Sequence, residues 1–330
     1  MSELRPIHSV PGSVGSGRAR AWPLFRGALT RLGILIGASA LIFLATAAIP
    51  GDFVSELLGQ DYTPELAQRM RVELGLDHSL IERFVLWLCA FLSGDFGLSF
   101  TTRTGVWQVV EPRLKNTLAL AAVTLVWFPV AVAAGLGMFM TSRRSQQLFR
   151  FVTQIVICTP DFLIAYIFIY VFAVELRIFP AISRISQGQP PLDQLRLLIL
   201  PSACLGVGMV AYVGRMVLAL LAMEERKDYF EFARLKGFGR GETALRYALP
   251  AIAPSILNLA LTYCAYLLTG VLVIEVVFGF AGLGDLTVSS VVWRDVPVLQ
   301  FCAILITSIY MLLYSLSDLV SGRFVARTAL

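Results

Sequence analysis

The sequence is poor in the residues that carry acid–base and metal chemistry. It contains only 2 histidines, and charged residues make up 15% of its 330 residues. The histidines, His8 and His78, lie in separate polar segments. Soluble domains contain about 25% charged residues. The composition therefore argues against a soluble domain and against a histidine-based metal or acid–base site.

Motifs of catalysis and nucleotide binding are also missing. The 5 cysteines are scattered without a Cys-x-x-Cys pair, so neither a zinc site nor a redox motif is indicated. The chain has no Gly-Lys pair, which a phosphate-binding P-loop requires. It also lacks HExxH, GxSxG and EF-hand patterns. We therefore expect no enzymatic activity, metal or cofactor in this chain, and any ATP hydrolysis must occur on another subunit.

Long apolar runs dominate the rest of the chain, which is 57% hydrophobic. A membrane-spanning helix needs about 20 apolar residues. Six runs are long enough: 29–49, 117–140, 151–174, 197–222, 251–275 and 298–320. The predicted fold class is an all-α polytopic membrane protein with six transmembrane helices in a lipid bilayer.

The distribution of Lys and Arg predicts the orientation, because cytoplasmic loops are enriched in these residues. They gather in the N-terminal segment, around Arg143 and in the loop 224–250. Both termini are therefore expected in the cytoplasm, which also accounts for the net charge of +5 without a nucleic-acid partner. The predicted domains are a flexible basic tail 1–28, a first transmembrane helix 29–49, an extracytoplasmic segment 50–115, a five-helix core 116–322 and a cytoplasmic tail 323–330.

The extracytoplasmic segment 50–115 is amphipathic and holds more acidic than basic residues. Short surface helices are predicted at 64–74 and 80–92. Two interpretations remain open, a solvated cap or a surface that receives an extracytoplasmic partner.

The stretch Glu224–Pro250 is the longest strongly charged run, and apolar segments flank it. A helix is predicted over 228–236, and glycines, beginning with Gly237, then favour a turn. A second helical piece, 242–249, is expected to end at Pro250, which suits the start of the next helix. This pattern is typical of a docking element for a soluble partner.

Here the sequence resembles the EAA loop of ABC-importer permeases: Glu-Ala-Ala, three residues, Gly, nine residues, then Ile-x-Leu-Pro. Five residues match at that spacing: Glu231, Ala233, Gly237, Leu249 and Pro250. Phe232 and Tyr247 depart from it. The resemblance implies that this loop couples the chain to an ATPase through Tyr229, Glu231, Phe232, Ala233, Leu235, Gly237, Leu249 and Pro250.

Further motifs resemble the peptide/nickel branch of these permeases. LGLDHSLIERFVLWL, GDFGLS and RLKNTLAL follow the first span, and Gly282-Leu283-Gly284 and Arg294-Asp295 come later. Ala281 stands where the branch usually has proline, and Val325-Ala326-Arg327 replaces Asp-Pro-Arg. The resemblance nevertheless covers nearly the whole chain after the basic tail.

The resemblance implies a permease subunit of a binding-protein-dependent importer in the bacterial inner membrane. Its expected partners are a second related permease, two cytoplasmic ABC ATPases that bind ATP and Mg²⁺, and an extracytoplasmic substrate-binding protein. Peptides are the favoured cargo, since no metal-ligand cluster argues for nickel. The alternative is a self-contained secondary transporter or channel. It is disfavoured because ion coupling usually requires carboxylates in mid-span, and Glu275 is the one weak candidate.

Polar residues inside the spans suggest a pathway, since ionisable groups there are costly and often functional. Arg215, Asn258, Thr262, Tyr266 and Thr269 are candidates for the pathway lining. Arg215 could instead pair internally or reach the membrane surface, and the others could join helices. Glu275 is expected to reach the outer surface. Candidates for an outer gate, by position and resemblance, are Gly282, Gly284, Arg294 and Asp295.

Overall fold

The computed structural model describes residues 18–47, 63–73, 78–184 and 195–328, and these are almost entirely helical. In chain order the elements are α1 (Arg18–Ala47), α3 (Pro64–Glu73), α4 (Leu80–Leu92), α5 (Val106–Leu125), α6 (Trp127–Met140), α7 (Arg143–Cys158), α8 (Asp161–Phe168), η2 (Ile169–Glu175), α9 (Leu195–Glu224), α10 (Asp228–Leu235), α11 (Arg240–Thr243), η4 (Ala244–Ala248), α12 (Leu249–Phe278), α13 (Leu283–Val292) and α14 (Val296–Thr328). Among these residues, strand-like pairing is limited to one bridge between Leu98 and Gly105.

The helices fit a polytopic membrane protein, but the predicted count of six spans is not confirmed. Within the described ranges, four helical stretches are long and apolar enough to cross a membrane: Val106–Met140, Leu195–Glu224, Arg240–Phe278 and Val296–Asp318. A bent pair of helices brings the number to at most five. The apolar part of α1, Thr30–Thr46, is shorter than these.

The predicted span 151–174 is not a straight helix, which corrects the sequence prediction. The helices on either side of Thr159-Pro160, Arg143–Cys158 and Asp161–Glu175, meet at 100°. Proline has no N–H to donate, and it disfavours helical backbone in the residue before it. Thr159 is accordingly extended, with φ −86° and ψ 126°. Apolar length alone predicted one span, because it cannot show where the chain turns.

The predicted domain boundaries also shift. The proposed flexible tail is helical from Arg18 onward, while residues 1–17 lie outside the described residues. α5 begins at Val106, so the predicted extracytoplasmic segment 50–115 ends inside a helix. At the other terminus, α14 continues to Thr328 through most of the predicted tail 323–330. The resemblance motif Leu74–Asp77 lies outside the described residues.

The centre of the bundle is α9, much of which is buried between α5, α6, α7 and α12. The crossing with α6 is close: a Cβ added to Gly135 would lie 2.5 Å from the carbonyl oxygen of Gly214 and 2.8 Å from the Cβ of Val217. Small residues allow helices to approach this closely in membranes. At this crossing the backbones of α6 and α9 are therefore in close contact.

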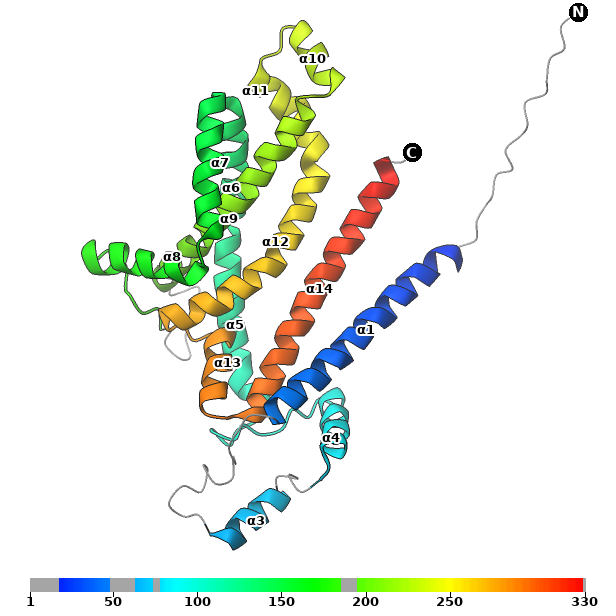
Figure 1. Ribbon diagram of the computed structural model, residues 1–330, viewed down its shortest axis with the longest axis vertical. Coiled ribbons are helices and arrows are strands. Elements are labelled where there is room, and N and C mark those ends of the chain that lie inside the picture. The colour runs from blue at the N-terminus through cyan, green and yellow to red at the C-terminus, as the bar shows by residue number, and fades with distance from the viewer. Residues whose placement is uncertain (1–17, 48–62, 74–77, 185–194, 329–330) are drawn as a thin grey trace, which may run out of the picture.

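The elements gather at two ends of the bundle (Figure 1). The short helices α10 and α11 lie at one end, towards which the N-terminus of α1 and the C-terminus of α14 point. The helices α3, α4 and α13 lie at the opposite end.

The two surface helices predicted at 64–74 and 80–92 are confirmed as α3 and α4. Ser79 and Glu82 form a capping box at the start of α4. Phe43 of α1 contacts Phe84 and Trp87 of α4 at ring-centroid distances of 5.4 and 5.7 Å, so aromatic packing holds α4 against α1.

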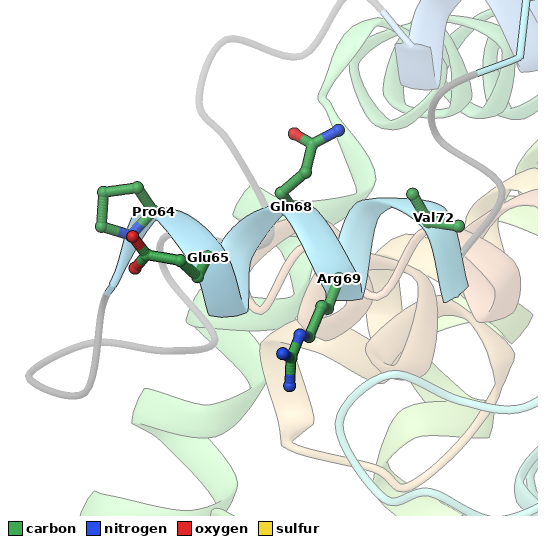
Figure 2. A pocket seen from close by; sticks show the side chains of 5 residues that line it. All are labelled: Pro64, Glu65, Gln68, Arg69 and Val72. Atoms are coloured by element: carbon green, nitrogen blue, oxygen red, sulfur yellow. The ribbon is translucent and has the colours of Figure 1, made fainter.

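One flank of α3 lines a shallow hollow. Figure 2 shows the side chains that line this hollow, all of which come from α3: Pro64, Glu65, Gln68, Arg69 and Val72. Ligand sites are usually concave and enclosed by several elements. A hollow lined by one short helix does not meet that description.

Replacing Gly135 with valine should destabilise the bundle by about 1–3 kcal/mol, because the added side chain would be forced into Gly214 and Val217. Gly137 is the matched control on the same helix, since a Cβ there meets nothing within 4 Å. Thermal unfolding of the purified variants in detergent measures the difference. Gly135→Val should melt at a lower temperature than Gly137→Val, and equal Tm values would contradict the close crossing.

Candidate functional site

The helix α10 is attached to the bundle by one face. Phe230 and Ala233 are buried, and the ring of Phe230 lies 6.3 Å from that of Phe139 at the end of α6. The guanidinium of Arg240 lies 4.2 Å from the centre of the Phe139 ring and pairs with Glu225 at the end of α9. The aromatic contact of Phe230 thus connects α10 to α6. The cation–π and ion-pair contacts of Arg240 connect α11 to α6 and to the end of α9.

The opposite face of α10 is exposed and partly apolar. Phe232 and Leu235 are 63% and 78% exposed, and Glu231 and Arg234 are exposed beside them. Exposing two large apolar side chains to water on a charged eight-residue helix is unfavourable. This face can receive a partner that covers the apolar pair and meets both charges.

Gly237 ends this helical element with a positive φ of 89°. Side chains are rarely tolerated in this conformation, and glycine adopts it without steric cost. A Cβ at Gly237 would meet nothing within 4 Å, so the requirement comes from the backbone and not from crowding within this chain. The predicted turn is confirmed.

Tyr229 belongs to the side of α10 that faces the bundle. Its hydroxyl donates a 2.7 Å hydrogen bond to Glu224, and Lys227 pairs with the same carboxylate at 2.7 Å. Burial, together with this hydrogen bond, raises the pKa of Tyr229 above its ordinary value. Tyr229 therefore remains a neutral donor that ties α10 to the end of α9.

The second helical piece of this loop does not end before the next helix begins, which corrects the prediction, whereas the predicted place of Pro250 at the start of that helix is confirmed. α11 and η4 continue directly into α12, with Pro250 in its first turn. Proline is tolerated there because the missing N–H would have no partner inside the first turn. Leu249 is partly buried against the core. The loop is thus joined rigidly to the span Arg240–Phe278.

At the other end of α12, Glu275 is fully buried, although the sequence predicted that it reaches the surface. Its carboxylate accepts 2.6 Å hydrogen bonds from the Thr117 hydroxyl of α5 and from the Gly284 backbone N–H. The Thr117 oxygen also accepts from the Leu283 N–H at 2.8 Å. Buried charges are tolerated only when hydrogen-bonded. We call Glu275, Thr117 and the segment 279–285 the outer latch.

The two glycines of the outer latch are required by space. A Cβ at Gly282 would overlap the Glu275 carboxylate, and one at Gly284 would overlap the backbone of Leu272. The same segment is held to α5 by two further contacts, a 2.9 Å ion pair between Arg113 and Asp285 and a 2.7 Å hydrogen bond from Asn116 to the Ala281 carbonyl.

Asp295 organises the turn between α13 and α14. It is buried and accepts hydrogen bonds from the Ser99 hydroxyl and from the backbone N–H groups of Phe100 and Thr101. The neighbouring Arg294 has a positive φ of 51°. Asp295 therefore holds the segment before α5 against this turn, so two predicted gate residues occupy a structured connection.

The predicted polar stripe of α12 divides into two parts. Ser317 of α14 donates a 2.9 Å hydrogen bond to Asn258 and lies 3.1 Å from the Thr262 hydroxyl. Tyr266 and Thr269 are exposed instead. The first pair joins α12 to α14, while the second pair remains on a surface of this chain.

Arg215 projects from α9 towards α7, where its guanidinium donates to the side-chain oxygen of Gln154. The side chain is partly exposed. Of the alternatives for Arg215, the hydrogen bond to Gln154 favours internal pairing.

Two carboxylates were missed or misjudged from the sequence. Glu275 was placed at the surface, although the two glycines that follow it indicate a close approach of backbone. The sequence prediction did not include Asp161, although this carboxylate interrupts the apolar run 151–174. Within the described ranges, no group of three or more His, Cys, Asp or Glu side chains is arranged to hold a metal ion.

Comparison with known proteins places these features in a family. Residues 128–330 match the model of the "Binding-protein-dependent transport system inner membrane component", and residues 23–121 match its N-terminal companion. A "Probable peptide ABC transporter permease protein" of Sinorhizobium fredii is 30% identical over 299 residues, covering 90% of this chain and 95% of the relative. A "Glutathione transport system permease protein" of Escherichia coli is 32% identical over 281 residues, covering 84% and 89%.

Thr117→Val should loosen the outer latch, because it leaves the Glu275 carboxylate and the Leu283 N–H each without one partner. Such losses cost about 1–3 kcal/mol. Thr124→Val is the matched control, since this buried threonine of α5 donates only to the Leu120 carbonyl of its own helix. Thermal unfolding and limited proteolysis at 279–285 measure the effect. Equal behaviour of the two variants would show that the latch is not held through Thr117.

Gly237→Ala should destabilise the end of α10 by about 1–2 kcal/mol, because alanine is strained at positive φ. Amide hydrogen exchange over 228–237 should accelerate by about 5–30-fold. Gly239→Ala serves as the control, because Gly239 has a negative φ of −68° and equally open surroundings. Unchanged exchange in Gly237→Ala would contradict the requirement for glycine.

Proposed function

The chain belongs to the family of binding-protein-dependent transport system inner membrane components, and we propose that as such a permease it moves di- or oligopeptides into the cell by alternating access. It is a multi-pass protein of the bacterial inner membrane and a permease subunit of an importer that depends on a binding protein. The names of the relatives support a peptide cargo, since one is called a probable peptide permease and another a glutathione permease.

The exposed face of α10 is the observation that carries the mechanism. Phe232 and Leu235 supply apolar anchors for a groove on a cytoplasmic ATPase, and Glu231 and Arg234 set the orientation by charge. Exposed apolar pairs with a polar rim are typical of protein interfaces. In this proposal two ATPases bind ATP and Mg²⁺. One docks on this chain and the other on a second, related permease.

Force applied to α10 passes into the bundle through packed groups. Phe230 presses on Phe139, and Arg240 pairs with Glu225, so α6 and α9 move with the docked helix. α11 continues through η4 into α12, which ends beside the outer latch. In this proposal, closure of the ATPases rocks these helices as a body and opens or closes the outer latch, as rigid-body motion does in other alternating-access transporters.

The orientation follows from the same assignment. The α10 end lies in the cytoplasm, together with both termini, and the end with α3, α4 and α13 lies outside, where a substrate-binding protein delivers the cargo (Figure 1). The basic loop 224–250 supports this direction.

The pathway is proposed along the surface that carries Arg215, Tyr266 and Thr269. The remaining candidates, Asn258 and Thr262, hold α14 against α12 through Ser317 and thereby stabilise the helices that carry the pathway. The gate residues Gly282 and Gly284 form the outer latch, and Arg294 and Asp295 form the turn beside it.

The test is co-purification of the tagged chain, expressed with the genes next to it, followed by an ATPase assay. The double variant Phe232→Glu, Leu235→Glu should weaken ATPase binding by about 30-fold or more, because central apolar anchors each contribute about 2 kcal/mol or more to an interface. Leu245→Glu is the control, since Leu245 is exposed on η4 and not on α10. A wild-type chain that purifies alone and still moves peptide in vesicles would contradict the proposal.

A further inference from the structure

Asp161 is a carboxylate at the break of a helix inside the membrane region. It begins α8 directly after Pro160, where the bent pair turns by 100°. Its side chain is half-buried, and among the described residues no hydrogen bond or ion pair to its carboxylate is found. A charged group in this setting is costly and marks a functional site by default. Broken helices near the centre of transporters commonly carry the binding site.

The carboxylate lies against α12. One of its oxygens would be 3.1 Å from a Cβ added to Gly270, so the side chain reaches the backbone of that helix. Tyr266 precedes Gly270 by one helical turn, and Tyr263 by two, so these residues share a face.

A third tyrosine completes the cluster from α9. The ring of Tyr263 lies 5.7 Å from Tyr212 and 5.7 Å from Tyr266. Tyr263 is buried, whereas Tyr212 and Tyr266 are exposed. Asp161 and the three tyrosines come from α8, α9 and α12. Tyr212 and Tyr266 are exposed on the surface where the pathway is proposed, and the buried Tyr263 packs between their rings.

Nearby cations do not neutralise this cluster. Arg215 lies one turn beyond Tyr212 on α9, but its guanidinium is bonded to Gln154 of α7. The start of α8 favours a negative charge through the helix dipole. The dipole explains why a carboxylate is tolerated at this position, but it does not explain why the carboxylate lies against Gly270, one turn from Tyr266 in a row of three tyrosines in ring contact.

We propose that Asp161 and the tyrosines 212, 263 and 266 form a subsite for a primary ammonium group of the cargo, such as the N-terminus of a peptide. The carboxylate provides the charge and a hydrogen-bond acceptor, and the ring faces attract the cation. A divalent metal ion does not fit, because it requires several oxygen ligands and this cluster has one carboxylate. The ammonium subsite rests on the proposed function, since it selects the chemistry of the same cargo.

The first test is protection from a carbodiimide, a reagent that modifies carboxylates in apolar surroundings. The purified permease–ATPase complex in nanodiscs is treated with dicyclohexylcarbodiimide, and mass spectrometry measures the modification of Asp161. Trialanine should protect Asp161, and N-acetyl-trialanine, which lacks the ammonium, should not. Glu175, exposed at the far end of the same bent segment, is the internal control and should be unaffected by either peptide.

The second test is uptake into proteoliposomes with the complete complex and a preloaded binding protein. Asp161→Asn should lower the kcat/KM for trialanine about tenfold, the loss expected for one charge-assisted hydrogen bond. Asp161→Glu should restore most of it, and Glu175→Gln should match the wild type. ATPase stimulation by the loaded binding protein should persist in Asp161→Asn.

The outcomes separate the two proposals. Equal protection by both peptides, or none, together with normal peptide uptake in Asp161→Asn, overturns the ammonium subsite and leaves peptide import standing. Selective protection by trialanine in a complex that imports no peptide supports the subsite and overturns the peptide cargo.

Discussion

Backbone hydrogen bonding in hydrocarbon is the constraint on which this structure depends. Within a membrane every peptide N–H and C=O needs a partner inside the protein, so the chain must be helical wherever it faces lipid. Breaks are tolerated only where neighbouring helices surround them, and Thr159-Pro160 makes such a break beside α9 and α12. At this turn the chain changes direction by 100°, and Asp161 lies against α12 near its tyrosines.

The two ends of the bundle are joined without a flexible link. The helical stretch Arg240–Phe278 begins beside the exposed α10 and ends at the carboxylate of Glu275. Packed interiors transmit displacement because they compress little. Movement at α10 therefore reaches the outer latch through one helix, while the close crossing of α6 and α9 at Gly135 prevents those helices from sliding independently. In the proposed mechanism, docking at α10 and opening of the outer latch are therefore mechanically coupled.

Much of the local structure could be predicted, because it rests on short-range chemistry. The bounds of α4 and the helix α10 agree with the sequence prediction, since a capping box and a glycine turn act within a few residues. The family was recognised for the same reason: the EAA residues keep a fixed spacing along the chain. The span 151–174 was predicted without its 100° bend, because hydropathy measures apolar length and is insensitive to direction. The second helical piece before Pro250 was also predicted to stop too early, because a proline in the first turn of a helix has the same sequence appearance as one after its end.

The sequence alone determined that this chain is helical and lies in a membrane, because composition decides those properties, and the spacing of the EAA residues pointed to its family. Only the tertiary structure decided what its polar side chains do. Glu275 became a buried latch residue because Thr117, distant in sequence, packs against it. Asn258 and Thr262 turned towards Ser317, whereas Tyr266, on the same predicted stripe, stayed exposed. The role of a polar group in a membrane depends on the partner it meets, and helix packing chooses that partner after the helices have formed.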